Sequence, residues 1–558
     1  MGATGSVMAG TLVDEAAKPA DGSDVAEDPI AEVVRLRALI KEAHKSAADA
    51  EGEAPATVAT SEEEPGTVAV PPVPPAQPAQ PAQLVPDAYV SASEILRCVH
   101  SKEKACVDVV GEALARIAAT SEINACIEVL ADSALAKAAE VDAKIAAGEA
   151  LGQLEGLPIL IKCNIDGPPG SLTSASTHAL AEWRPQTNAP CVAKLLEAGA
   201  IPIAKTNMPQ LAVGVNAMSP LYGRTLNPHN LTVNAGASSS GTAAAIAAGI
   251  ASCGLGSDTG GSLRIPASCC GIVGVRPSRG RWPSGGVVPC SSLRDTVGPM
   301  GSCVADAALL DSVVSGEEVV TKPDSLSGVK IAIPQDWISA MCPNGQSQAA
   351  TKALEAAKVA FEAAGAEVLV VDGMNTVRQT TKDQWVMPVL PAVYEDCHAD
   401  LTAYLEGCGE GRPVATVEDV LAAMPDEQRV KYVGLYGLKE EGDAEKIKVK
   451  IEKRDEAVAN MEAAYREWFA SNGVSAMILP AFANEPTTID IEGEAGKNFM
   501  NEFLFSFHMN ECRVPSMAIP IKSVKFPESG VPTSILMYGV EDRPLYGLAL
   551  ALEASLTA

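Results

Sequence analysis

The chain has 558 residues, of which 42 are lysine or arginine and 70 are aspartate or glutamate, so its formal net charge is −28. A balance this acidic argues against a nucleic-acid binder, which needs clustered basic side chains, and against docking on an anionic membrane. Hydrophobic residues make up 47% of the chain, which is enough for a sizeable buried core.

The N-terminal stretch differs in composition from the rest of the chain. Residues 1–87 hold fifteen acidic and five basic side chains, a net charge of −10, and are rich in alanine, proline, glutamate and glutamine. Such a stretch cannot bury enough apolar surface to offset the entropy of ordering it. We therefore expect residues 1–88 to be a disordered acidic tail and residues 89–558 to form one domain. The amphipathic segment 30–45 is expected to be mostly unfolded, with a partner-bound helix as the alternative.

Targeting and redox signals are weak. Residues 1–6 match the N-myristoylation pattern, but one acyl chain without a basic patch anchors only marginally, so no lipid anchor is predicted. No secretory signal is predicted either. The 14 cysteines include no C-x-x-C pair, which argues against a zinc site or a disulfide scaffold and favours reduced thiols in the cytoplasm.

From residue 89 onward, helical and strand patterns alternate. Helices are expected at 93–119, 133–147, 190–198 and 349–364, and strands at 159–161, 200–204, 329–333 and 366–371. This alternation predicts an α/β fold with a large mixed, mostly parallel sheet covered by helices on both faces. The longest apolar run, 243–255, is too short to span a membrane and is expected to be a buried core helix.

The densest functional signal is a pair of Ser/Gly clusters at 236–241 and 254–266. Glycine allows backbone N–H groups to approach a ligand closely, so a phosphate cradle and an oxyanion hole are the candidate purposes. Neither glycine-rich phosphate motif is complete. The G-x-S-x-G turn of many serine hydrolases is also absent, because Ser240 stands where that turn needs glycine. Helix caps and tight turns would explain either cluster alone.

A catalytic base other than histidine is needed if one of these serines is a nucleophile, because His178 and His229 lie in loop-like surroundings. Lys162 is the candidate, since it directly follows an apolar strand. Burial would lower the pKa of its amine towards neutrality and make it a usable base. The alternative is a lysine that reaches water from the end of the strand.

Several segments together resemble the amidase signature family, namely 156–162, 205–208, 236–241, 256–262, 270–277 and 286–300. The resemblance implies Ser262 as nucleophile, Ser238 as a bridging serine on a cis peptide, and Lys162 as base. It also implies an oxyanion hole and supporting residues, formed by the N–H groups of Thr259, Gly260, Gly261 and Ser262 and by Ser239, Asp258 and Arg264. The implied activity is hydrolysis of a carboxylic amide through a serine acyl-enzyme, with no metal or organic cofactor.

The sequence departs from the family pattern at three positions. Cys163 stands in place of an acidic residue, and Ala237 and Ser240 replace glycines. We expect these changes to be tolerated, because all three reacting groups are present. Cys163 could be a rival nucleophile, but nothing beside it in sequence would activate it, and a packed thiol is the prediction.

The expected partner is a small-molecule amide, with no nucleic acid and no membrane span; a homodimer is left open. Residues 393–405 and 417–423 weakly resemble the arylacetamide branch, such as indoleacetamide hydrolases. Alternatives are an enzyme like fatty acid amide hydrolase, a glutaminyl-tRNA-forming amidotransferase component, or a non-catalytic paralogue that uses its tail for interaction. Aromatic residues that would line an acyl pocket or belong to the core are Trp385, Tyr394, Tyr432, Tyr436, Phe499, Phe503 and Phe505.

Overall fold

The structure is a computed structural model and describes residues 84–377, 390–436, 444–489, 504–507, 510 and 512–557. All of these belong to the unit Ala82–Ala558. The predictions for the tail, apart from residues 84–88, and for segment 30–45 lie outside the described residues.

The first expected helix, 93–119, is two helices in the structure. α3 (Ala92–His100) begins after Ser91, whose side chain accepts a hydrogen bond from the N–H of Glu94. The chain then turns through Lys102, which has a left-handed φ of 64°, and α4 (Cys106–Ala119) follows. The prediction of one helix was wrong because the charged linker between them breaks the backbone hydrogen-bond ladder without a glycine or proline to announce it.

The remaining elements follow the expected alternation. The strands are β1 (Cys126–Val129), β2 (Pro158–Lys162), β3 (Ile201–Thr206), β4 (Met218–Ser219), β5 (Gly223–Arg224), β6 (Cys253–Asp258), β7 (Val273–Arg276), β8 (Thr296–Gly301), β9 (Lys330–Pro334), β10 (Glu367–Val371), β11 (Ala476–Pro480), β12 (Ser516–Lys525) and β13 (Pro532–Tyr538). The helices are α5 (Ala131–Ala147), α6 (Pro190–Glu197), α7 (Ser240–Ala247), α8 (Arg264–Cys270), α9 (Val304–Ser315), α10 (Gln335–Met341), α11 (Gln348–Ala363), α13 (Leu390–Gly407), α14 (Val417–Ala422), α15 (Asp426–Tyr436), α16 (Ala444–Asn472), α18 (Leu504–Phe507) and α19 (Asp542–Thr557).

One mixed sheet of 11 strands forms the centre of the fold, in the order β1-β3-β2-β6-β8-β7-β12-β13-β11-β9-β10. Strands β3, β2 and β6 pair in parallel, as do β11, β9 and β10. The strands between these two groups, and β1 at the edge, pair antiparallel. The predicted mixed α/β sheet is confirmed, with its parallel pairing in these two groups.

Helices cover both faces of the sheet, and the alternation of side chains along β2 shows how. Leu160 belongs to a core cluster with residues of α4, α5 and α7. Its neighbours Ile159 and Ile161 point to the other face and belong to a cluster with residues of α6 and α9. Because successive strand residues face opposite ways, the fully apolar run before Lys162 is what a strand buried on both faces requires.

The apolar run 243–255 is not a single core helix, so that prediction was wrong. α7 ends at Ala247, the chain turns at Gly249 with φ of 69°, and β6 begins at Cys253. Periodicity could not separate a buried helix from a buried strand across this run. Within the described residues, no helix is long and apolar enough to cross a membrane.

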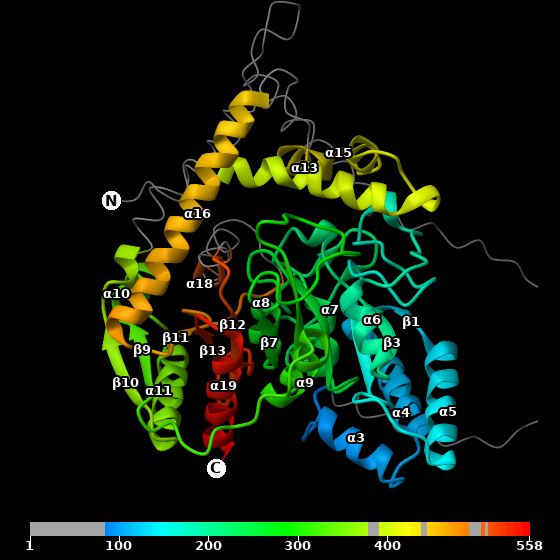
Figure 1. Ribbon diagram of the computed structural model, residues 1–558, viewed down its shortest axis with the longest axis horizontal. Helices are drawn as coiled ribbons and strands as arrows, with labels where there is room; N and C mark the ends of the chain where they lie inside the picture. The colour runs from blue at the N-terminus through cyan, green and yellow to red at the C-terminus, as the bar shows by residue number, and fades with distance from the viewer. Residues whose placement is uncertain are drawn as a thin grey trace, which may run out of the picture. The chain divides into compact units, whose positions relative to one another are not determined.

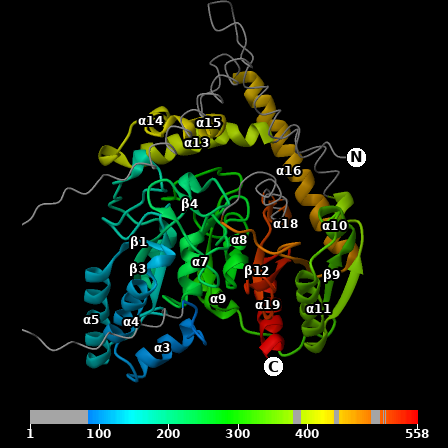
Figure 2. The ribbon, with the colours of Figure 1, turned by 180° about the vertical axis from the view of Figure 1, so that it is seen from behind.

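β2 and β6 are parallel neighbours, so Lys162 and Asp258, their last residues, lie at the same edge of the sheet. The chain between β10 and β11 carries helices α13 to α16. Figures 1 and 2 show α13 and α15 at this end of the sheet, whereas α3 and α19 lie towards the opposite end.

Candidate active site

Lys162 is fully buried at the end of β2. Its Nζ donates to the Oγ of Ser238 at 2.8 Å, to the Oγ of Ser257 at 2.8 Å and to the carbonyl of Ser257 at 3.3 Å. Burial lowers the pKa of Lys162 to about 7, against the opposing pull of Asp258 and Asp295. Much of the amine is therefore neutral near pH 7 and can accept a proton.

Ser238 lies at the N-terminal side of α7, and the Ala237–Ser238 peptide is cis, as the resemblance implied. Its neighbour Ser239 joins the two Ser/Gly clusters. The N–H of Ser239 donates to the carbonyl of Ser262 at 3.2 Å, and its hydroxyl donates to the carbonyl of Ser257 at 3.2 Å. The two clusters that are separate in sequence are thus held together at the end of β6.

Ser262 lies in the turn between β6 and α8 and is 7% exposed. No hydrogen bond from a described residue engages its hydroxyl. Of the four backbone N–H groups expected to form the oxyanion hole, that of Gly261 donates instead to the Oδ1 of Asp258 at 2.8 Å. The assignment of Gly261 is corrected on this ground, because its donor is already used within the turn. The N–H groups of Thr259, Gly260 and Ser262 make no hydrogen bond to any described residue.

Asp258 fixes the shape of this turn. Its carboxylate is fully buried and accepts from Nε of Arg264 at 3.1 Å, from Nη1 of Arg276 at 3.1 Å and from the N–H of Leu263 at 3.1 Å. Burial opposes ionisation, but the two guanidinium groups outweigh it and hold the pKa of Asp258 well below its usual range. Asp258 and Arg264 therefore support the turn that carries Ser262, as expected, and do not contact Lys162.

Four neighbours of the reacting groups were not predicted: Ser257, Arg276, Asn510 and Asn164. Ser257 accepts a hydrogen bond from Lys162, and Asn164 donates to Ser257 Oγ at 3.1 Å. Asn510 donates to the carbonyl of Thr259 at 2.6 Å. The signal available for Arg276 was a charged residue ending an apolar strand, the same signal that identified Lys162.

The three departures from the family pattern are buried and packed. The Sγ of Cys163 lies 3.3 Å from Ser174 Oγ, and burial raises the pKa of its thiol. Such a thiol stays protonated and is a poor nucleophile, in agreement with the expected packed thiol. Ala237 is fully buried, and the Ser240 hydroxyl donates to the carbonyl of Asn207 at 3.5 Å.

The histidines have other surroundings. His229 lies 3.0 Å from the carbonyl of Cys270 through its Nε2, and burial lowers its pKa. Neither His178 nor His229 forms a hydrogen bond with Ser238 or Ser262. Within the described part of the chain, no group of three His, Cys, Asp or Glu side chains is placed to hold a metal ion.

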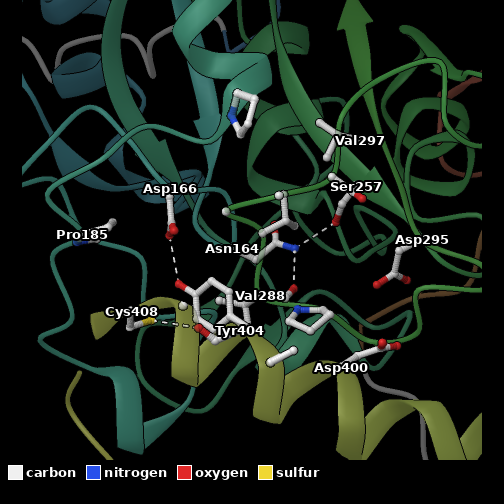
Figure 3. A pocket seen from close by; sticks show the side chains of 18 of the residues that line it. Asn164, Asp166, Pro185, Ser257, Val288, Asp295, Val297, Asp400, Tyr404 and Cys408 are labelled. Carbon is white, nitrogen blue, oxygen red and sulfur yellow. Dashed lines mark hydrogen bonds between the residues drawn. The ribbon is translucent and has the colours of Figure 1, made fainter. Parts of the chain in front are cut away.

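A cavity of about 710 Å³ lies beside the reacting groups (Figure 3). Ser257 and Thr259 line it, whereas Lys162, Ser238 and Ser262 do not. The rest of its wall comes from the loop after β2, from residues 183–190 and 284–297, and from α13. The cavity thus reaches the back of the turn that presents Ser262.

The aromatic candidates for a pocket are core residues where the structure describes them. Tyr432, Tyr436 and Phe505 are buried in apolar clusters and do not line the cavity. Trp385, Phe499, Phe503 and the side chain of Tyr394 lie outside what the structure describes. The aromatic residues that do line the cavity are Trp183 and Tyr404, neither of which was proposed for that role.

A model of the amidase family matches residues 108–541, so the chain belongs to the amidase family. The glutamyl-tRNA(Gln) amidotransferase A-type polypeptide of a Synechococcus strain is 30% identical over 480 residues, which is 80% of this chain and 94% of that relative. Its counterpart from Picosynechococcus is 40% identical over 236 residues, so there the chain matches about half of the relative, 48% of its length, and 42% of its own. A solved amidase structure is 27% identical with a TM-score of 0.68, covering 83% of this chain and 99% of that one.

Proposed function

We propose that the chain is an amidohydrolase that cleaves the C–N bond of a linear carboxylic amide through an acyl-enzyme on Ser262. The observation that carries the proposal is the 2.8 Å contact between Lys162 and Ser238, made by a lysine whose pKa is lowered to about 7. A neutral lysine next to a serine that neighbours a second serine is the arrangement that activates a hydroxyl without histidine.

In the proposed mechanism, the Oγ of Ser262 attacks the amide carbonyl while its proton passes to Ser238 and the proton of Ser238 passes to Lys162. The N–H groups of Thr259, Gly260 and Ser262 would bind the oxyanion, each worth about 2.7–4 kcal/mol in the transition state. Lys162 then returns its proton through Ser238 to the departing nitrogen. Water enters by the reverse route and releases the carboxylic acid.

A second candidate is a glutamine-hydrolysing component that passes ammonia to a partner protein. It is favoured by the relatives named for glutamyl-tRNA(Gln) amidotransferase, which match over most of both chains. A panel of glutamine, indole-3-acetamide, phenylacetamide and a long-chain amide, scored by ammonia release, separates these activities. Hydrolysis of glutamine alone would favour the amidotransferase component.

Labelling with a fluorophosphonate probe tests the nucleophile. We expect the wild-type chain and the Ser133→Ala variant, altered at an exposed helix position, to be labelled equally. Ser262→Ala should lose the label and the ammonia release, and Lys162→Ala should lose nearly all turnover. Full labelling of Ser262→Ala would contradict the assignment.

A further inference from the structure

The wall of the cavity is rich in hydrogen-bond acceptors. The carboxylates of Asp166, Asp295 and Asp400 line it. Figure 3 shows Asp166 with Tyr404 on one side of the cavity and Asp295 with Asp400 on the other. Among the described residues that line the cavity, the cation is Arg184, and it is already engaged by Glu128 at 2.5 Å and by the carbonyl of Gly170 at 2.8 Å.

The carboxylates are held by neutral donors, not by cations. The Tyr404 hydroxyl donates to Asp166 at 2.9 Å, and the N–H of Ser292 donates to Asp400 at 2.6 Å. No ion pair joins either carboxylate to a described residue. Burial raises the pKa of Asp166 to about 6, the direction expected for a carboxylate that lacks a nearby counter-charge.

Asn164 gives a second, independent indication of a ligand. It is 1% exposed and lines the cavity. Its Nδ2 donates to Ser257 and to the carbonyl of Val288, but its Oδ1 has no hydrogen-bond partner among the described residues. An orphaned buried acceptor is costly, and a ligand that carries N–H donors would satisfy it.

We propose that this cavity binds a protonated primary amine carried by the acyl part of the amide substrate, so that the preferred substrates are cationic amides. The proposal rests on the proposed amidohydrolase function. Ser257 and Thr259 connect the cavity to the turn of Ser262, so a short chain can place its amide at Ser262 and its ammonium among the acceptors. Trp183, Val288 and Val297 supply apolar wall for the intervening methylenes, and the volume suits a small ligand.

Three linear amides of similar length test the proposal: 5-aminopentanamide is cationic, hexanamide neutral and 4-carbamoylbutanoate anionic. We expect kcat/KM for 5-aminopentanamide to exceed that for hexanamide about 10-fold or more, which is the worth of hydrogen bonds to a charged group. The anionic amide should be the poorest. Hexanamide hydrolysed as well as 5-aminopentanamide would overturn the subsite and leave the amidohydrolase function standing.

The double variant Asp166→Asn with Asp400→Asn removes two charges but keeps acceptors for Tyr404 and Ser292. It should bring the ratio of the two kcat/KM values close to one, whereas Asp426→Asn, at an exposed position on α15, should leave it unchanged. An unchanged ratio in the double variant would overturn the proposal. If the double variant does not fold, Asp400→Asn alone serves, with a reduced ratio expected.

Calorimetry on Ser262→Ala separates the two proposals. This variant should bind 5-aminopentanamide more tightly than hexanamide even though it cannot turn either over. Such binding, together with a wild-type chain that hydrolyses none of the amides, would support the cation subsite and refute the function. Equal binding of both amides would overturn the subsite.

Discussion

The lowered pKa of Lys162 makes a quantitative prediction for the pH dependence of kcat/KM. The neutral amine is the active base, so activity should rise as pH increases through about 7 and then level off. With that pKa, the neutral fraction is about one-eleventh at pH 6 and about ten-elevenths at pH 8, a rise of about 10-fold. A lysine with its usual pKa would instead give a 10-fold rise for each pH unit up to pH 9.

The magnitude follows from the surroundings of the amine. Lowering a lysine pKa from 10.5 to about 7 corresponds to about 5 kcal/mol of preference for the neutral form. Complete burial supplies it, and the hydroxyls of Ser238 and Ser257 solvate the neutral amine without a counter-charge in contact.

The assay is kcat/KM for a neutral amide such as hexanamide from pH 5.5 to 9.5. Glu553 needs a control, because burial raises its pKa to about 7 as well. It lies on α19 against the start of α9, where it accepts from the N–H of Val304 at 3.1 Å. Glu553→Gln should leave the inflection in place. A profile that still rises with unit slope at pH 9, or an inflection lost in Glu553→Gln, would refute the role of Lys162.

Two predictions concern stability, measured by urea denaturation. Arg264→Met removes one of the guanidinium groups that pair with the buried Asp258, and should cost about 3–5 kcal/mol; a cost below about 1 kcal/mol would contradict this account of the turn. Gly241→Ala places a methyl group 2.3 Å from the backbone nitrogen of Asn207, and should cost about 1–3 kcal/mol or more. Gly111→Ala, a helical position with open space, should instead stabilise by about 0.5–1 kcal/mol. Effects of the same sign would show that the close approach at Gly241 is relieved.

Lys162 could be found from the sequence because its signal is local. A charged residue directly after five apolar ones at a strand end is unusual, and family resemblance supplied its partner. What no local pattern contains is the distance between Lys162 and Ser238, which are 76 residues apart. The parallel register of β2 with β6, in which Ile161 lies opposite Leu255, brings the lysine to the residues of the second cluster.

Other parts of the site depend on contacts that sequence patterns do not encode. The N–H of Gly261 is taken by Asp258 because the turn closes on its own carboxylate, and motif matching cannot see that a donor is occupied. The cavity likewise needs Tyr404 and Asp400 of α13 to meet the loop after β2, more than 230 residues earlier in the chain. The break between α3 and α4 escaped notice because charged residues suit both helices and turns.

The position of α13 has a consequence for how members of this family can diverge. The groups proposed to move protons come from β2, from the start of α7 and from the turn after β6, all within the first 180 residues or so of the domain. Asp400 and Tyr404, in contrast, are carried by the excursion between β10 and β11 and approach the same cavity from outside the sheet. Replacing that excursion, or only the solvent-side residues of α13, would alter the charge and shape presented to a substrate without changing the spacing of Lys162 and Ser238. Selectivity can therefore be inherited, exchanged or engineered as a separate cassette of the polypeptide.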